Sequence, residues 1–141
     1  MSTNQQIMEG LAQALAPVAT AVPDLQVYAG WLPTPSPPSV EVFPGDPFQE
    51  AEGFSKAKRL FWTVRARVAM TDTDSGQSLL LQLLEPDGPT SVEAALCWDG
   101  LGGLVDSVSV AEGTPSGFRE YTDGDFPGRL LGCEWRVEVM T

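Results

Sequence analysis

Acidic and glycine-containing segments are the parts of this sequence that most resemble ligand-binding sites. Asp72, Asp74 and Gly76 begin like a calcium-binding loop. An EF-hand loop needs glycine at its sixth position and an acidic residue at its twelfth, but those positions hold Gln77 and Leu83. The segment is better explained as a turn that leads into a helix, with Asp74 as its cap.

Two further segments can be compared with known chemistry. Gly100, Gly102 and Gly103 suggest a phosphate-binding loop, but the third glycine of GxGxxG is missing, no lysine follows, and a strand rather than a helix comes next. Asp123 and Asp125 could form a carboxylate pair for acid–base chemistry or for a metal. No other type of ligand lies near them in the sequence, which favours a solvated loop.

The residue types that most often carry catalysis are scarce. The chain has no histidine, which removes the commonest general base and the commonest zinc ligand. No serine lies in a GxSxG context. Cys97 and Cys133 form no CxxC motif, and we interpret both as small buried hydrophobic residues rather than a disulfide. We therefore predict no catalytic, cofactor-binding or metal site and a protein that is not an enzyme.

Composition indicates one acidic globular domain. The 141 residues are 43% hydrophobic, and 8 basic against 19 acidic residues give a net charge of −11. Such a surface repels nucleic acid and anionic membranes. The N-terminus lacks a secretory signal, and no run approaches the roughly 20 apolar residues that span a membrane. We expect a single domain over 1–141 that is made in the cytosol.

Hydrophobic alternation identifies the central strands. Leu60–Met70 alternates apolar and polar residues with a period of two, and Leu131–Val139 repeats the pattern. Opposite charges on the polar faces could pair across the two strands, which is a hypothesis; alternatively, these strands are not neighbours and the charges are solvated. The charged residues are Arg65, Arg67, Glu134 and Glu138.

The other elements follow from caps, periodicity and turn residues. Capping boxes at Thr3 and Thr90 begin two helices, and Pro17 is expected to end the first. We predict an α+β fold, a mostly antiparallel β-sheet with two to three helices packed on one face. The expected helices are 3–16, 74–85 and 90–98. The expected shorter strands are 25–29, 39–43 and 104–112, and the last strand is 130–140. The Pro-rich connector is 31–38, and the long loops are 44–58 and 113–129.

Large aromatic residues lie outside the periodic segments. Protein–protein interfaces are enriched in aromatic residues, so we predict that these form an interaction surface. The alternative is a set of small hydrophobic clusters under the loops. The predicted interface residues are Trp31, Phe48, Phe54, Phe118, Tyr121 and Phe126.

The order of these motifs resembles the tail terminators, or tail-completion proteins, of lambda-type long-tailed bacteriophages. The resemblance covers nearly the whole chain and is a pattern of elements without a catalytic signature. The acidic loops and the long C-terminal loop depart from the pattern. It is carried by the helix ending in LAPVAT, the connector VYAGWLPTPSPPSVEVFP, the strand WTVRARVAM, the helices TDTDSGQSLLLQLLE and PDGPTSVEAAL, the strand VDSVSVAE, the loop with Tyr121 and the closing strand LLGCEWRVEVM.

The resemblance implies a tail-terminator-like fold and a structural virion protein. Such a subunit forms a homohexameric ring at the head-proximal end of the tail, stops polymerisation of the tube, and joins the tail to the head. Its partners are the tail tube protein and a head-closure or neck protein, and the genome passes through its lumen without specific DNA binding. It is assembled in the host cytoplasm. The loop from Phe118 to Phe126 is expected to dock on the tube, with the Phe48 to Phe54 loop as second candidate.

Two other functions remain open from the sequence. The chain could be a different neck component, such as a head-closure or adaptor protein, or a minor tail protein. It could also be a small enzyme or ligand-binding domain, which a pocket lined by carboxylates with perturbed pKa values would favour.

Overall fold

Two long strands form the centre of the sheet. The computed structural model describes residues 3–30, 38–51, 58–69, 73–97, 100–111, 114–121 and 130–141. Strand β3 (Lys58–Ala69) pairs antiparallel with β6 (Leu130–Met140), from Arg59 opposite Met140 to Ala69 opposite Leu130. The predicted alternation of both strands is confirmed, and of the two possibilities left open for their placement the structure shows the one in which they are neighbours.

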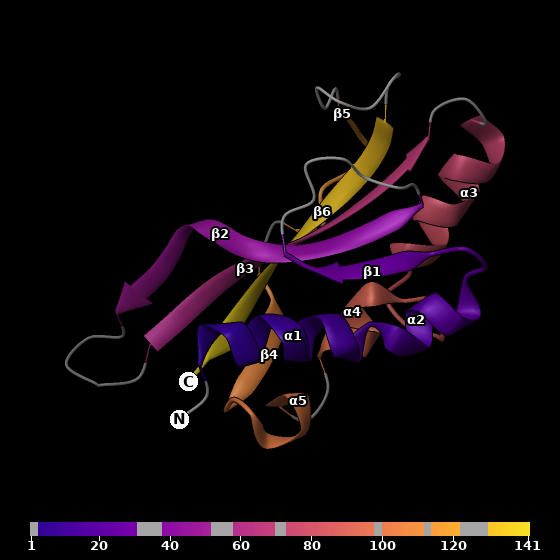
Figure 1. Cartoon of the computed structure of the whole chain (residues 1–141). Coiled ribbons are helices and arrows are strands. Elements are labelled where there is room, and N and C mark those ends of the chain that lie inside the picture. The colour runs from indigo at the N-terminus through magenta and orange to yellow at the C-terminus, as the bar shows by residue number, and fades with distance from the viewer. Residues whose placement is uncertain are drawn as a thin grey trace.

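The remaining strands flank this pair in a mixed sheet (Figure 1). Among the described residues the order is β1-β2-β3-β6-β4, and β5 pairs with the same β6. Strand β1 (Gln26–Ala29) runs parallel to β2 (Ser39–Ala51), whereas every other described pair is antiparallel. The α+β class is confirmed, but the parallel pair makes the sheet mixed, which the sequence prediction did not specify.

The hydrophobic core lies between one face of the sheet and the helices. From β3 and β6 alternate residues point into it, among them Trp62 and Trp135, which are 1% exposed. Helix α1 contributes Ile7 and Leu11, which are 1% and 0% exposed. Burial of each large apolar side chain stabilises the fold by roughly 1.5–3 kcal/mol, so this face of the sheet is strongly specified.

The N-terminal helix ends just before the proline that was expected to end it, and a second, short helix follows. Helix α1 (Asn4–Ala14) begins with the predicted capping box, in which Thr3 and Gln6 exchange hydrogen bonds of 2.9 and 3.1 Å. The chain then forms α2 (Ala16–Ala21), with Pro17 in its first turn. Proline lacks an N–H, but the first turn of a helix needs none, so Pro17 changes the helix direction instead of ending the helical segment.

Helix α3 (Thr73–Leu83) packs on the same face of the sheet, with Leu80 and Leu83 fully buried. It begins at Thr73, so Asp74 lies inside the helix and is not its cap, contrary to the prediction. The side chains of 73–75 lie outside the described residues.

The second predicted capping box was displaced by one residue. Helix α4 (Val92–Leu96) is capped by Ser91, whose Oγ accepts a hydrogen bond of 3.0 Å from the Ala94 N–H. The Thr90 hydroxyl instead donates to the carbonyl oxygen of Gln82, 2.8 Å away. The contact between Thr90 and the end of α3 therefore overrides the local sequence motif.

A left-handed turn connects α4 to the next strand. The short segment α5 (Gly100–Gly103) contains Leu101 with φ 56° and Gly102 with φ 72°. A Cβ at Gly100 would collide with the carbonyl oxygen of Val105, so this glycine is required for close approach. The glycines thus build a turn before β4 (Ser107–Val110), which is shorter than the predicted strand 104–112.

Two segments predicted as loops contain strand. Strand β2 extends through the predicted loop 44–58 as far as Ala51, with a register shift between Pro44 and Gln49. A short strand, β5 (Arg119–Tyr121), lies within the predicted loop 113–129. Turn-forming residues dominate both segments, but proline is compatible with a bulge and β5 is too short to show a period of two.

We predict that alkaline pH destabilises the protein through the core thiol of Cys133. Burial, and secondly the nearby charge of Glu134, raise the pKa of Cys133 from 9.0 to about 12. Above about pH 9 the unfolded chain loses this proton whereas the folded chain retains it, so the free energy of unfolding falls as pH rises. Urea unfolding at several pH values should show a shallower decline for Cys133→Ala.

Thiol labelling provides the control for this prediction. Both cysteines were predicted to be buried, which is correct for Cys133 and wrong for Cys97, because Cys97 follows the last residue of α4 and is exposed. A small alkylating reagent should therefore modify Cys97 in the folded protein and modify Cys133 only after unfolding. An unchanged pH dependence in Cys133→Ala, or rapid labelling of Cys133 in the folded protein, would contradict it.

Candidate functional site

The second face of the sheet carries the basic residues of the described structure. On β3 and β6 they alternate with the core residues, so they point away from the helices. The chain as a whole has a net charge of −11, yet all the basic side chains that the structure describes lie on this one face. We call it the open face; its basic residues are Arg59, Arg65, Arg67, Arg119 and Arg136.

A buried ion cluster lies at the centre of the open face. Glu41 of β2 is opposite Arg65 of β3, and its Oε1 lies 2.8 Å from both Nε and Nη2 of that arginine. Nη2 of Arg67 is 2.5 Å from the same oxygen. The side chains of Glu41 and Arg67 are 0% exposed, and that of Arg65 is 7% exposed. One carboxylate therefore links two buried guanidinium groups.

Aromatic rings complete this cluster. The guanidinium carbon of Arg65 lies 5.0 Å from the ring centre of Phe43 and 5.4 Å from that of Tyr121. Gly132 permits this packing, because a Cβ there would be 2.8 Å from the Tyr121 ring and 3.2 Å from Cγ of Arg67. Cations over aromatic faces are stabilised electrostatically, so the rings compensate part of the cost of burying Arg65.

More exposed charge pairs surround the buried cluster. Arg119 and Glu134 lie 2.9 Å apart, and Arg59 and Glu138 lie 2.7 Å apart. Arg136 extends over the ring of Phe61 at 4.1 Å. The open face thus alternates charges and rings, with a buried centre and more exposed charge pairs around it.

The hypothesis of charge pairing across β3 and β6 holds for the strands and for one pair of positions, while the ion pairs found in the structure join other partners. Arg65 and Glu134 are opposite in the β3–β6 register, as neighbouring strands require. The ion pairs instead link Arg65 and Arg67 to Glu41, and Glu134 and Glu138 to arginines on β5 and β3. Glu41 is fully buried, and an ion pair there is screened less by water than an ion pair at the rim of the face. The two arginines therefore pair with Glu41.

The titration behaviour of this face favours a structural role. Burial, followed by the repulsion of Arg65, lowers the pKa of Arg67 below its ordinary value. Burial, followed by the charge of Glu134, raises the pKa of Tyr121 well above 10. Both shifts leave the phenol neutral and the guanidinium charged near neutral pH, so neither group exchanges protons there.

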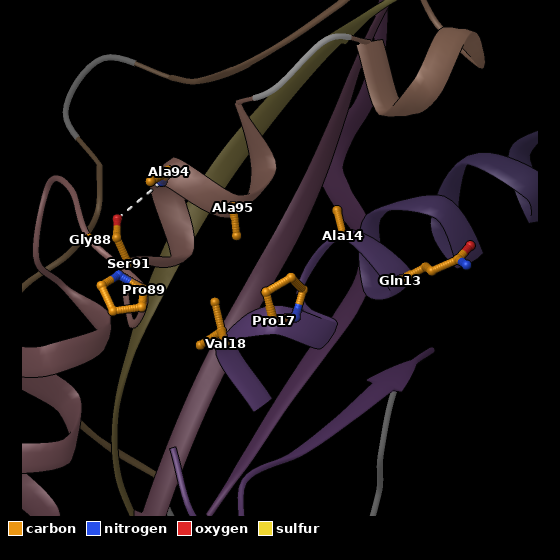
Figure 2. Close-up of a pocket in the computed structure, with 9 residues that line it drawn as sticks. All are labelled: Gln13, Ala14, Pro17, Val18, Gly88, Pro89, Ser91, Ala94 and Ala95. Carbon is orange, nitrogen blue, oxygen red and sulfur yellow. Dashed lines mark hydrogen bonds between the residues drawn. The ribbon is translucent and has the colours of Figure 1, made fainter. Parts of the chain in front are cut away.

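Two cavities accompany these surfaces. A polar one of about 350 Å³ lies at the rim of the open face, beside Asp46, Arg119 and Glu134. The other, of about 440 Å³, lies on the helical side where α1 meets α2 and faces α4 (Figure 2). Both volumes fall in the range of small ligand sites. We call the second the apolar pocket; its lining residues are Gln13, Ala14, Pro17, Val18, Gly88, Pro89, Ser91, Ala94 and Ala95.

The described aromatic residues of the predicted interface have different environments. Phe118 is 41% exposed at the start of β5. Phe48 lies in β2 and packs edge-on against Trp62, with ring centres 5.0 Å apart, whereas Tyr121 packs on the open face. Phe118 is therefore the one of these three that is exposed, whereas Phe48 and Tyr121 are half-buried. The remaining predicted interface residues, Trp31, Phe54 and Phe126, lie outside the described residues.

The sequence prediction missed the centre of the open face and the apolar pocket. Glu41 interrupts the apolar run from Val40 to Val42, which was the available signal for a buried acid needing a cation. The pocket joins two segments about 70 residues apart and left no local pattern. The suggested aspartate pair, Asp123 and Asp125, lies outside the described residues.

The described part of the chain has neither a metal-binding cluster nor a membrane-spanning helix, and the sequence has no match among known families. Within the described part of the chain, no three His, Cys, Asp or Glu residues are grouped so that they could hold a metal ion. None of the helices described is both long and apolar enough to cross a membrane. No protein-family model and no curated protein matches the chain.

We predict that the shared carboxylate of Glu41 is required for stability. Glu41→Gln removes the negative charge between two buried arginines, and breaking a buried ion pair typically costs about 3–5 kcal/mol. The matched control is Glu134→Gln, whose partner Arg119 has a side chain 60% exposed and whose loss should cost below about 1 kcal/mol. Urea unfolding followed by tryptophan fluorescence measures both, and equal losses would contradict the assigned difference.

Proposed function

We propose that this chain is a structural subunit of a long-tailed bacteriophage virion, a tail terminator. In this proposal six copies form a ring on the head-proximal end of the tail tube, stop its polymerisation and join the tail to the head. The proposal rests on the sequence resemblance to that family, which extends through nearly every element of the chain.

One structural observation supports a ring-forming subunit above others: the described basic side chains lie on only one side of the sheet, where they accompany Glu41, Glu134 and Glu138. The open face carries every described basic side chain, whereas the helices and their connecting turns carry acidic ones. A contact that joins unlike surfaces is heterologous, and such contacts close into rings when the rotation between copies allows. The described acids on the helical side are Glu9, Asp24, Glu85, Asp87 and Glu93.

The mechanism in this proposal is steric and electrostatic. A closed ring offers the tube one matching face but no second copy of the tube's own growing edge, so growth ends there. The lumen must let the genome pass without holding it. A net charge of −11 suits that requirement, because an acidic wall repels phosphates.

Two places in the structure are available for contact with the tube. The predicted docking segment around Phe118 includes β5, so its deletion would strip a strand from β6. The second candidate, the end of the β2–β3 hairpin, forms one end of the sheet away from α2 and α3 (Figure 1). Point substitutions therefore test docking more cleanly than a loop deletion.

We predict that the purified protein forms rings and caps tail tubes. Light scattering should give the mass of six copies, and negative-stain images of a mixture with assembled tubes should show density at one end only. Tubes polymerised in the presence of the protein should be shorter than tubes polymerised alone. A protein that stays monomeric and leaves tube length unchanged would contradict the proposed function.

A further inference from the structure

The apolar pocket is built to accept an apolar group. Pro17 and Val18 of α2 face Ala95 of α4 across it (Figure 2). The hydroxyl of Ser91 is already engaged, because its Oγ accepts the Ala94 N–H at 3.0 Å. Its walls are mostly methyl, methylene and ring carbons, so a polar occupant would gain few hydrogen bonds there.

Two acidic residues are sequence neighbours of residues that line the pocket. Asp87 directly precedes the lining residue Gly88, and its Oδ1 accepts the N–H of that glycine. Glu93 directly precedes the lining residue Ala94. All described basic side chains lie on the open face, on the opposite side of the sheet. An apolar group that is followed by a positive charge would therefore match both the pocket and its rim.

The chain itself carries such a group. Among the described residues, the large hydrophobic side chains that are exposed are Leu81, Leu104 and Phe118, of which one is aromatic. Phe118 is 41% exposed and is followed by Arg119, whose side chain is 60% exposed. Arg119 already contacts Glu134 at 2.9 Å, but with that exposure its guanidinium can contact a second acid. The aromatic ring and the adjacent cation together match the pocket.

Phe118 and the pocket lie in different parts of one molecule. Phe118 precedes β5, which pairs with the first residues of β6 at the top of the view, whereas the pocket lies where α1 meets α2, on the helical side of the sheet (Figure 1). A ring and a pocket that are separated in this way cannot satisfy each other within the chain. They can meet between two copies, in a head-to-tail contact.

We propose that Phe118 of one copy inserts into the apolar pocket of the next copy, with Arg119 beside Asp87 and Glu93 of that neighbour. This proposal rests on the proposed function, because the contact would be the interface between adjacent subunits of the ring. It assigns Phe118 to a neighbouring copy, so the tube contact falls to other residues. A volume of about 440 Å³ is ample for one benzyl group.

The first test compares two substitutions of exposed apolar residues. Phe118→Ala should weaken self-association about tenfold to a hundredfold, measured by sedimentation velocity over a concentration series. Leu81→Ala is the matched control, because Leu81 is 56% exposed on α3 and lies outside the pocket. Its self-association should equal that of the natural chain.

Charge reversal tests the rim separately. Arg119→Glu and Asp87→Lys should each weaken association, and the double variant should recover a substantial part of it, because the two charges attract again. Asp106→Lys, an exposed acid at the start of β4, is the control for a general change in net charge. Equal losses in Asp87→Lys and Asp106→Lys, or no recovery in the double variant, would overturn the assigned contact.

The outcomes separate this contact from the proposed function. Rings that cap tubes and are unaffected by Phe118→Ala would overturn the contact and leave the function standing. Rings that persist in Phe118→Ala but no longer cap tubes would place Phe118 on the tube, and this result would also overturn the proposed contact between copies. Association that depends on Phe118 without any capping would support the contact and contradict the function. A small apolar molecule retained in the pocket, detected by native mass spectrometry, would overturn the contact.

Discussion

The fold depends on the burial of Glu41 between Arg65 and Arg67. The cost of removing these charges from water is offset only when the strands hold one register, with Glu41 opposite Arg65. A slip of one residue would turn the carboxylate into the hydrophobic core and the apolar residues of β2 and β3 toward the open face. The ion cluster and the core therefore specify the same pairing from opposite faces of the sheet.

This arrangement also produces two unlike sides from one pair of strands. Successive side chains along a strand point to opposite faces of the sheet. Because every second residue of β3 and β6 fills the core, the arginines between these residues point to the open face. The helices then cover the core, and the charged residues among the exposed positions of the helices and their connecting turns are acidic, as at Glu9 and Asp87. Charge segregation is thus a consequence of strand periodicity combined with a one-sided helix layer.

Sequence patterns predicted those parts of the fold that long local signals specify. The alternation in Leu60–Met70 and the capping box at Thr3 lead to β3 and α1. Local signals failed where tertiary contacts decide the outcome, as at Thr90, which bonds the end of α3 instead of capping a helix. Of the candidate interface, sequence identified Phe118 but missed Glu41 and the pocket, because both depend on segments that meet only in the folded chain.

The physical properties of the described groups fit association better than chemistry at a single site. On the open face, burial raises the pKa of Tyr121, so its phenol stays neutral near neutral pH and serves packing against Arg65. Exposed features instead come in complementary kinds: an aromatic ring with an adjacent cation, and an apolar pocket with the carboxylate of Asp87 beside it. A strong net negative charge would drive identical copies apart, so any self-association must use such local matches of opposite charge and apolar burial. When the side of one copy that carries the basic residues contacts the acidic side of the next copy, the local attraction between these charges offsets part of the repulsion between the two negatively charged chains.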